Sequence, residues 1–410
     1  MDLPYPPMAG APLRNWQNMN ILRQYGEVAI FSVFLGKPPN RSLPEISLWN
    51  HHNLSQKRLL RERIRSRLSF LTPWRYTNFD AFYPHGAVVE LGKTLEQFKP
   101  SLIVLEHLWV CRYIPFVKQY SCPIIIDEHN VESDLFKQRN LPASSLHSNL
   151  QNQMYAAYIK YMERQAVRSV DRVWVCSESD AKLIKDLYGK YLNPSVVPNG
   201  IDVSEYDAVR SNRCSLPENW THNDHTLIFI GCFSYSPNAE AAKFLINSIY
   251  PPLKAIYPDF KLLIVGKNPT PELKAAAERH SCVICTGTVD DVKPYLAGAS
   301  VVVTPLFQGG GTRLKILEAF AAKRPVVSTT KGAEGLRVVD GEHLLIRDEV
   351  DSIVAGICEL WSNQDLYQKL TENAYNLVCA EYSWEAVSRK VEPLIEQLFS
   401  DLNSENKARE

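Results

Sequence analysis

The segment Gly309–Ala319 (GGGTRLKILEA) combines residue types that together could bind an anion. An apolar run, Ser300–Pro305, precedes it and predicts a buried strand, and a helical pattern begins near Thr312. Glycines at a strand-to-helix turn let the backbone approach a ligand closely. The first turn of the helix also offers unpaired N–H groups and a positive dipole end. We therefore expect an anion site formed by four residues: Gly309, Gly310, Gly311 and Thr312.

Charged side chains on the same helix extend this site. Arg313 and Lys315 place positive charge at the N-terminal end of the helix, which also favours an anion. Glu318 lies about two turns into the helix, and a carboxylate accepts hydrogen bonds from sugar hydroxyl groups. The segment therefore offers a diphosphate seat and a hydroxyl acceptor, which are what a nucleotide-sugar needs.

A histidine follows another buried strand. The apolar run Ile124–Ile126 ends in Asp127, Glu128 and His129. A histidine at the end of a strand can point into a ligand site, and its charge is tunable near neutral pH. The alternative is a structural histidine that is buried or caps a helix. Asp127 and Glu128 are adjacent and point opposite ways on a strand, so they are not a ready acid–base pair.

Weaker signals come from turns at the ends of other strands. A glycine turn follows the strand that ends at Ile230, and a second one follows the strand that ends at Val265. Another turn precedes Val289, where main-chain groups could read the edge of a base, and the turn Val197–Asp202 contains Asn199. Each signal alone indicates only a tight turn. The residues that we take from these turns as donor contacts are Gly231, Lys267, Val289 and Asn199.

Size and composition exclude several classes of protein. A chain of 410 residues with 45% hydrophobic residues suggests at least two domains. A formal net charge of +0 gives no reason to expect nucleic acid as a partner. The apolar runs are shorter than the roughly 20 residues of a membrane span, and the first residues do not resemble a signal peptide. Nine scattered cysteines, including the pair Cys282 and Cys285, indicate reduced thiols in a cytoplasmic protein.

Short apolar runs alternate with helical patterns along the whole chain. This alternation predicts an α/β fold with two doubly wound, Rossmann-like parallel-sheet domains facing a cleft. We expect the first domain at residues 1–203, a polar linker at 204–224, the second domain at 225–381, and a final helix at 382–410. The strands that we expect cover these ranges: Glu27–Phe34, Leu102–Leu105, Pro123–Ile126, Arg172–Cys176, Thr226–Ile230, Lys261–Val265, Val283–Thr286, Ser300–Thr304 and Pro325–Ser328.

The start of the first domain is unusual. A doubly wound domain usually opens with an apolar strand, but this chain opens with the proline-rich residues Pro4–Pro7 and a loop at Ala9–Pro12. Either the domain lacks that strand or the start of the sequence is clipped.

The segment Lys57–Leu68 is densely basic. Leu60, Ile64 and Leu68 recur at helical spacing and leave the basic side chains largely on the other faces. Such a helix can lie on an anionic membrane, or it can be the solvated face of an ordinary surface helix. Nucleic acid binding is disfavoured because aromatic residues are not interleaved with the charges.

The order of these motifs resembles glycosyltransferase family 4, a family of retaining enzymes with the GT-B fold. The resemblance runs from about Pro4 to about Leu398, and its most specific part is Gly309–Gly335. It implies that the second half binds the nucleotide-sugar and that the last helix crosses back to the first domain. Glu318 takes the place of the second carboxylate of the Glu-x7-Glu motif, which holds the ribose, whereas the first carboxylate falls at Gly310.

The departure at Gly310 implies that main-chain N–H groups of Gly310, Gly311 and Thr312 recognise the donor sugar. The basic pair of the family is replaced by Ser234–Asn238, so the expected diphosphate contacts are Arg313, Lys315 and Lys267. By resemblance His129 is the active-site histidine, Gly10 belongs to a glycine loop near the diphosphate with Arg14 in support, and Leu314 joins the donor-binding set.

The resemblance implies transfer of a hexose, with retention, from a UDP- or GDP-linked sugar to an acceptor hydroxyl, with no metal and no further cofactor. The acceptor is open and could be a glycan, a lipid-linked molecule or a small molecule. We expect a cytoplasmic protein that could lie on the inner face of a membrane through Lys57–Leu68. The alternatives are a nucleotide-sugar epimerase or phosphorylase on the same fold, and a non-catalytic protein that binds nucleotide-sugars.

Overall fold

The computed structural model describes residues 10–34, 46–54, 78–138, 146–217 and 223–409. The chain forms two compact units, each of which is described by itself. The first unit contains Met1–Pro198 and Ser388–Glu410, and the second contains Asn199–Val387. The boundary therefore lies at residue 198 rather than at 203, and residues 204–224 belong to the second unit instead of forming a linker. The basic segment Lys57–Leu68 lies outside the described residues.

Parallel strands form the centre of the first unit. Four of them lie in the order β3-β4-β5-β6, and two more form a separate parallel pair, β1-β2. All five residues of β4 are buried because it has a neighbour on each side. The strands are β1 (Ala29–Phe34), β2 (Leu48–Asn53), β3 (Ile103–Glu106), β4 (Ile124–Glu128), β5 (Arg172–Val175) and β6 (Ser195–Val196).

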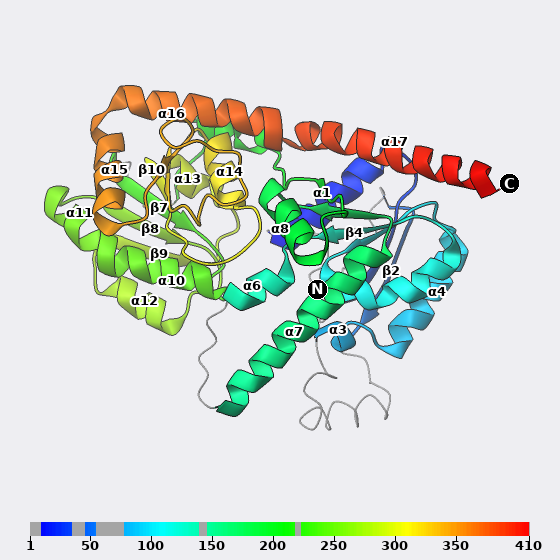
Figure 1. Ribbon diagram of the computed structural model, residues 1–410. Helices are drawn as coiled ribbons and strands as arrows, with labels where there is room; N and C mark the ends of the chain where they lie inside the picture. Colours follow the sequence, from blue (N-terminus) through cyan, green and yellow to red (C-terminus); the bar gives the residue numbers. More distant parts are fainter. Residues whose placement is uncertain (1–9, 35–45, 55–77, 139–145, 218–222, 410) are drawn as a thin grey trace. The chain divides into compact units, whose positions relative to one another are not determined.

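Helices surround these strands (Figure 1). Helix α8 begins after Ser177, whose side chain accepts a hydrogen bond from the N–H of Asp180, as expected of an N-cap. The last helix, α17, begins in the second unit and belongs to the first unit from Ser388 onward. The helices are α1 (Gly10–Leu22), α3 (Asn78–Ala81), α4 (His85–Phe98), η1 (Leu108–Tyr113), α5 (Ile114–Val117), η2 (Lys118–Tyr120), α6 (Glu132–Gln138), α7 (Leu146–Ser169), α8 (Glu178–Tyr188) and α17 (Trp384–Arg409).

A parallel sheet of six strands, in the order β12-β11-β10-β7-β8-β9, forms the centre of the second unit. Strand β7 is buried along its length, and its residues alternate between two cores. Leu227 and Phe229 pack in one core, and Ile228 and Ile230 pack in the other. The strands are β7 (Thr226–Ile230), β8 (Lys261–Val265), β9 (Val283–Gly287), β10 (Val301–Thr304), β11 (Val326–Ser328) and β12 (Leu345–Ile346).

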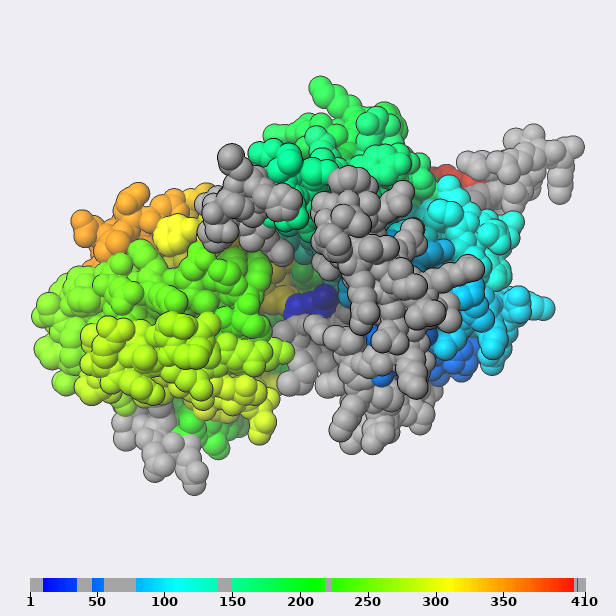
Figure 2. Space-filling model, turned by 90° about the horizontal axis from the view of Figure 1, so that it is seen from below, coloured from blue at the N-terminus to red at the C-terminus, as the bar shows by residue number. Residues whose placement is uncertain are grey.

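Helices cover both faces of this sheet, and α10 to α12 form the green to yellow-green surface in Figure 2. The helix expected at Asn238–Tyr250 is divided, because α10 passes through a π-helical turn, η4, before α11 begins. The helical elements are η3 (Val203–Tyr206), α9 (Asp207–Arg210), α10 (Ser236–Phe244), η4 (Leu245–Ile249), α11 (Tyr250–Ile256), α12 (Pro271–Glu278), α13 (Lys293–Ala297), α14 (Leu314–Ala321), α15 (Val350–Ser362), α16 (Gln364–Leu377) and η5 (Val378–Tyr382).

The α/β fold with two doubly wound parallel-sheet domains is confirmed. Strands β2, β6 and β12 are not among the ranges expected from the sequence, and all three are edge strands with little continuous apolar sequence. Within the described residues, no helix is both long enough and apolar enough to span a bilayer.

Candidate functional site

The glycine loop of the second unit joins β10 to α14. Gly309 and Gly311 adopt positive φ angles of 108° and 73°, which side chains on L-residues disfavour. A Cβ on Gly309 would lie 2.8 Å from the hydroxyl of Tyr235, so the loop packs tightly there. Helix α14 begins at Leu314, two residues after the start expected near Thr312. The Thr312 hydroxyl is buried and has no hydrogen-bond partner among the described residues.

Arg313 is part of the loop's own structure. Its guanidinium donates to the carbonyl oxygens of Gly309 and Gly311 at 3.0 Å each, to that of Gly310, and to that of Lys331 at 3.4 Å. The side chain is buried. This geometry departs from the expectation that Arg313 contacts the diphosphate directly, because carbonyls of the loop occupy its donors. Arg313 therefore holds the loop in this structure, and its contact with a diphosphate stays a prediction.

Lys315 lies on the first turn of α14 and is half-buried. Its ammonium donates to Oδ1 of Asn238 at 2.9 Å and lies 4.2 Å from the centre of the Phe229 ring. Removal from water, together with repulsion from Arg313, lowers the pKa of Lys315 to about 7. Asn238 was not expected from the sequence. The segment Ser234–Asn238 stood out only for its lack of basic residues, which gives no sign that an amide faces Lys315.

Glu318 is one turn further along α14. Removal from water raises its pKa, whereas Lys315 and a hydrogen bond with Tyr206 oppose that shift. Tyr206 lies on η3, in the segment that was expected to be a linker, so this partner was also missed. The carboxylate is half-buried and keeps acceptor capacity for a ligand hydroxyl.

The ends of β7 and β8 bring two more of the expected glycine turns together. Because β10, β7 and β8 are neighbours, their carboxyl ends lie at one edge of the sheet. A Cβ on Gly266 would lie 1.8 Å from the carbonyl oxygen of Gly231, so only glycine fits there. Lys267 is exposed next to this contact.

Three expected contacts of the second unit remain, namely Leu314, Val289 and Asn199. Leu314 and Val289 are half-buried and pack against the same hydrophobic core, so their side chains serve packing. Asn199 is half-buried at the first position of the unit. None of the three positions is tested as a ligand contact by this geometry, and each stays a prediction.

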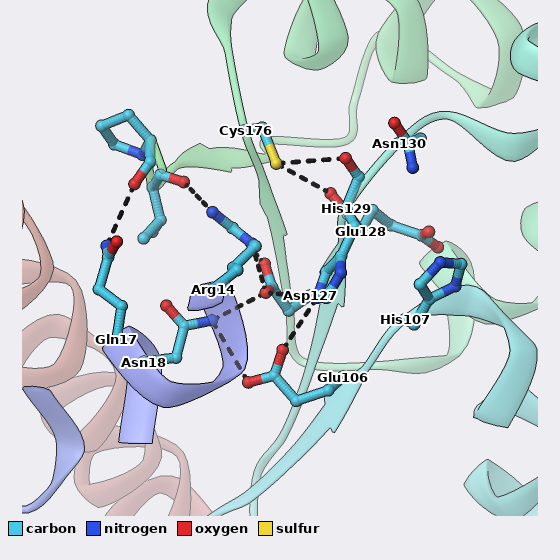
Figure 3. Close-up of polar contacts among 12 residues, drawn as sticks. Arg14, Gln17, Asn18, Glu106, His107, Asp127, Glu128, His129, Asn130 and Cys176 are labelled. Atoms are coloured by element: carbon cyan, nitrogen blue, oxygen red, sulfur yellow. Dashed lines mark hydrogen bonds and ion pairs between the residues drawn. The ribbon is translucent and has the colours of Figure 1, made fainter. Parts of the chain in front are cut away.

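In the first unit, polar residues gather where β3 and β4 end (Figure 3). The Arg14 guanidinium donates to both carboxylate oxygens of Asp127, with Nε 2.7 Å from Oδ2. Asn18 donates to the same oxygen at 2.8 Å. Nε2 of His129 lies 3.1 Å from Oε2 of Glu106 and 3.4 Å from Oδ2 of Asp127. The sequence predicted His129 as a site residue, but it did not reveal that Arg14, Asn18 and Glu106 surround it.

The charges in this cluster support one another. Burial disfavours the Asp127 carboxylate, but Arg14 and His129 outweigh burial and hold its pKa well below the usual range. Burial likewise disfavours the His129 imidazolium, but hydrogen bonds with Asp127 and Glu106 raise its pKa. Burial and the nearby Asp127 raise the pKa of Glu106. The Asp127 carboxylate thus lies between the Arg14 guanidinium and the His129 ring, and the pKa shifts of Asp127 and His129 run in the directions that favour an ion pair between them.

Gly10 begins α1 with a φ angle of 54° and is exposed. A Cβ at Gly10 would meet nothing within 4 Å, so the left-handed backbone, not lack of space, favours glycine. Arg14, which was expected to support this glycine, is turned to Asp127 and also donates to the carbonyl of Val197 at 2.7 Å.

His107 is a further histidine that sequence reasoning missed. It follows β3 with a φ angle of 84°, an uncommon value for a residue with a side chain. Its ring centre lies 5.0 Å from that of His129, and its Nε2 lies 3.5 Å from Oε1 of Glu132. Burial, then the charge of His129, lowers its pKa well below the ordinary value. Its place directly after a buried strand, like that of His129, was the available signal.

Glu106, Asp127 and His129 are close enough to share a cation, since one ligand atom from each lies within 4.8 Å of the others. Arg14 already supplies positive charge to Asp127, and a raised pKa means that a proton on His129 competes with any metal. The donor set therefore fits an internal ion-pair cluster better than a metal centre.

Solved structures share this architecture over nearly the whole chain. Sucrose-phosphate synthase from Thermosynechococcus elongatus is similar with a TM-score of 0.71 at 16% identity, over 96% of this chain and 94% of that chain. Anabaena HepE in complex with UDP and glucose is similar with a TM-score of 0.63 at 14% identity, over 95% of this chain and 96% of that chain. The two units thus define the GT-B fold.

Family models match both halves of the sequence. The model described as Glycosyltransferase Family 4 matches residues 33–205, and that described as Glycosyl transferases group 1 matches residues 224–363. The chain belongs to glycosyltransferase family 4, as its motifs indicated.

Curated relatives match over part of their length. A protein of Klebsiella pneumoniae, described as an uncharacterized 44.6 kDa protein in the cps region, is 25% identical over 254 residues, which are 60% of this chain and 59% of that protein. Phosphatidyl-myo-inositol mannosyltransferase of Mycolicibacterium smegmatis is 27% identical over 201 residues, 48% of this chain and 50% of that protein. The match thus spans between half and three-fifths of these two relatives.

Proposed function

We propose that this protein transfers a hexose from a nucleoside-diphosphate sugar to an acceptor hydroxyl, with retention at the anomeric carbon and without a metal. The observation that carries this proposal is the loop at the carboxyl end of β10. There, glycine amides, the Lys315 ammonium and the Glu318 carboxylate come from one short segment of the second unit, together with the Thr312 hydroxyl, which has no partner among the described residues.

The groups of this loop suit the parts of a nucleotide-sugar. The N-terminal end of α14 and Lys315 would bind the diphosphate, because amide dipoles and an ammonium both stabilise anions. Glu318 would accept hydrogen bonds from the ribose hydroxyls. Lys267 is exposed at the neighbouring strand end and can add charge. The UDP in the similar HepE structure supports a UDP-linked donor, and a GDP-linked donor is the other choice.

The donor sugar would be held by backbone and by His129. Gly310 stands where the family places a glutamate, so the N–H groups of Gly310, Gly311 and Thr312 would recognise the sugar hydroxyls. Gly10 is assigned to the diphosphate side of the donor and His129 to the sugar, as the resemblance implies. A protonated His129 can donate a hydrogen bond, which the raised pKa favours.

In the reaction, the bond between the anomeric carbon and the diphosphate oxygen breaks, and the acceptor oxygen bonds to that carbon from the same face. The acceptor proton passes to the departing phosphate oxygen. Lys315 and the loop amides stabilise the negative charge that grows on the diphosphate, and such fixed donors are worth about 10²–10³ in rate each. Arg313 contributes by holding the carbonyls of the loop so that its amides face the ligand.

The acceptor class is proposed from the relatives. The name of the similar phosphatidyl-myo-inositol mannosyltransferase favours a lipid-linked acceptor over a glycan or a small molecule. A lipid-linked acceptor would agree with a cytoplasmic protein that lies on the inner face of a membrane through Lys57–Leu68. Flotation with anionic liposomes, compared with neutral ones, tests that contact.

The experiment that tests the function has two arms. First, a thermal-shift panel of nucleoside diphosphates and nucleotide-sugars should identify UDP or GDP compounds, because a ligand of the native state raises the melting temperature. Second, nucleotide release from the chosen donor is measured with and without glycan and lipid acceptors. Conversion of the donor sugar to its epimer without acceptor would favour an epimerase instead, and a shift without any turnover would favour a binding protein.

A further inference from the structure

We propose that Asn238 is a positioning residue for the transfer: its side-chain amide holds the Lys315 ammonium in place and favours its charged form. Asn238 lies on α10, whereas Lys315 lies on α14. The inference rests on the proposed function, because Lys315 has a diphosphate to bind only there. Asn238 is not one of the donor contacts proposed above, and it would act through Lys315 alone.

The orientation of the Asn238 amide is fixed by the backbone beside it. Its Nδ2 donates to the carbonyl oxygen of Cys232 at 3.0 Å. Because a carbonyl oxygen only accepts hydrogen bonds, the amide nitrogen has to face Cys232, and the amide oxygen is turned to Lys315. Nζ of Lys315 donates to that oxygen at 2.9 Å. The Asn238 side chain is buried, and a flipped amide would set two donors together at one end and two acceptors together at the other.

Gly231 leaves the space in which this amide lies. A Cβ on Gly231 would lie 3.0 Å from Cγ and 3.1 Å from Nδ2 of Asn238. The backbone of Gly231 is outside the left-handed region, so its conformation alone does not require glycine. The close approach of Asn238 does, because a side chain at position 231 would displace the amide.

The groups that act on the charge of Lys315 come from three elements. Arg313 next to α14 repels the ammonium, and Glu318 on α14 attracts it. Strand β7 contributes the Phe229 ring, and α10 contributes Asn238. Removal from water is the largest influence, and it brings the pKa of Lys315 to about 7. Since a hydrogen bond to the charged form favours that form, loss of the Asn238 acceptor should lower the pKa of Lys315 further.

The segment Ser234–Asn238 therefore has a role that needs no charge. The resemblance places a basic pair there, and this segment has no lysine or arginine. The cation comes instead from α14, and α10 supplies the acceptor that fixes it. Because β7 and β10 are neighbours in the sheet, the turns after them can make this exchange.

The first test is a titration of Lys315 in the free protein. The Cε resonance of isotope-labelled Lys315, identified by its loss in Lys315→Met, is followed by NMR from pH 5 to pH 10. Asn238→Ala removes the acceptor and should lower the midpoint of the titration by about 0.5 pH unit or more. Asn238→Asp puts a carboxylate in the same place and should raise the midpoint by about 1 pH unit or more.

Two further variants separate the placement of the amide from general effects on the fold. Gly231→Ala keeps Asn238 but displaces its amide, so it should lower the midpoint as Asn238→Ala does. Asn247→Asp adds the same charge as Asn238→Asp at an exposed position of η4, and it should leave the midpoint at the wild-type value. Equal midpoints in the wild type and the two Asn238 variants, or shifts in the same direction in both variants, would overturn the proposal.

The second test links the titration to turnover, because the pH dependence of kcat/KM reports ionisations of the free enzyme. A lower midpoint leaves fewer molecules with a charged Lys315. Asn238→Ala should therefore reduce kcat/KM for the donor by about threefold or more at pH 8 and by little at pH 6. A reduction of the same size at both pH values would also overturn the proposal, since loss of charge would not be its cause.

Failure of this inference and failure of the proposed function are distinguishable, because the titration needs no donor. Opposite shifts of the midpoint in a protein that turned over no nucleotide-sugar would refute the proposed function alone. They would leave the hold of Asn238 on Lys315 standing.

Discussion

The candidate site regions of the two units satisfy their charges in different ways. In the first unit Asp127 is held by Arg14, Asn18 and His129, so the polar groups are partners of one another. In the second unit the glycine loop is held by Arg313, while the Thr312 hydroxyl has no partner among the described residues and Glu318 keeps acceptor capacity. The difference indicates that the polar groups around Asp127 satisfy one another, whereas the glycine loop keeps unused hydrogen-bonding capacity among the described residues.

The largest expected effect is on the stability of the first unit. Arg14→Ala leaves the Asp127 carboxylate buried without its cation, which should cost about 3–5 kcal/mol of unfolding free energy. Arg23→Ala, an exposed change next to the same helix, serves as the control. Chemical denaturation followed by fluorescence measures both. Because Arg14→Ala could prevent folding, Arg14→Lys is measured as well and should fall between the two. Equal stability of Arg14→Ala and Arg23→Ala would show that the ion pair between Arg14 and Asp127 does not stabilise this cluster.

In the second unit, substitution of Lys315 should reduce turnover of the donor more than it reduces the stability of the protein. Lys315→Ala removes the half-buried ammonium at the N-terminal end of α14, and we expect kcat/KM for the donor to fall by about 10²-fold. Lys323→Gln, beyond the other end of the helix and paired with Glu372 on the surface, should stay near the wild-type value. If Lys315→Ala and Lys323→Gln had the same kcat/KM for the donor, a residue other than Lys315 would have to contact the diphosphate.

The two regions should also respond to pH in opposite directions. The raised pKa of His129 means that its contribution to stability is complete below the ordinary pKa near 6.5 and is lost as pH rises through the folded value. The pKa of Lys315 is lowered to about 7, so its unfolded state binds the extra proton between pH 7 and its ordinary value of 10.5. The contribution of Lys315 to the free energy of unfolding therefore rises as pH increases from about 7 to 10.5.

Thermal melts of Lys315→Met and His129→Gln from pH 6 to pH 9 separate these contributions. Lys315→Met should lose the rise of melting temperature with pH that comes from Lys315, and it should keep the fall that comes from His129. His129→Gln should lose the fall and keep the rise. If neither substitution altered the dependence of the melting temperature on pH, the assignment of that dependence to Lys315 and His129 would be contradicted. Donor affinity should fall as pH rises above about 7, because the free protein then loses the Lys315 ammonium.

The smallest expected effect belongs to the exposed Lys267. Its charge lies in water at the end of β8, so Lys267→Ala should weaken donor binding by about threefold at low salt and less at high salt. Titration of the donor at two ionic strengths measures this. A loss as large as that of Lys315→Ala would place Lys267 in direct contact with the diphosphate.

The comparison also explains what could be predicted from the sequence. The loop and helix at Gly309–Glu318 are contiguous, so apolar periodicity and glycines were sufficient to locate them. The partners Asn238 and Tyr206 come from distant segments and are ordinary polar residues in the sequence. Pairing of Arg14 with Asp127 joins residues 113 positions apart and depends on how α1 packs over the sheet. Nothing local in the sequence encodes it.

The hydrogen-bond partners of Arg313 could not be predicted either, although the loop carbonyls lie within a few residues of it in the sequence. The sequence predicts a cation at the helix N-terminus but not the direction of its side chain. In the structure, three loop carbonyls accept hydrogen bonds from the Arg313 guanidinium. The alternating pattern predicted parallel, doubly wound sheets but not the order of their strands, and β2, β6 and β12 lie at sheet edges, where one paired side leaves little apolar signal.

The most direct measurement is calorimetric binding of UDP and GDP to the full chain and to Glu318→Gln, with Glu372→Gln as a surface control. We predict that one nucleotide binds the wild type and Glu372→Gln alike, and that Glu318→Gln weakens binding by about tenfold or more because a neutral amide is a poorer acceptor for the ribose hydroxyls. Equal affinity of all three proteins, or no binding of either nucleotide by the wild type, would contradict a nucleotide site at the β10–α14 loop.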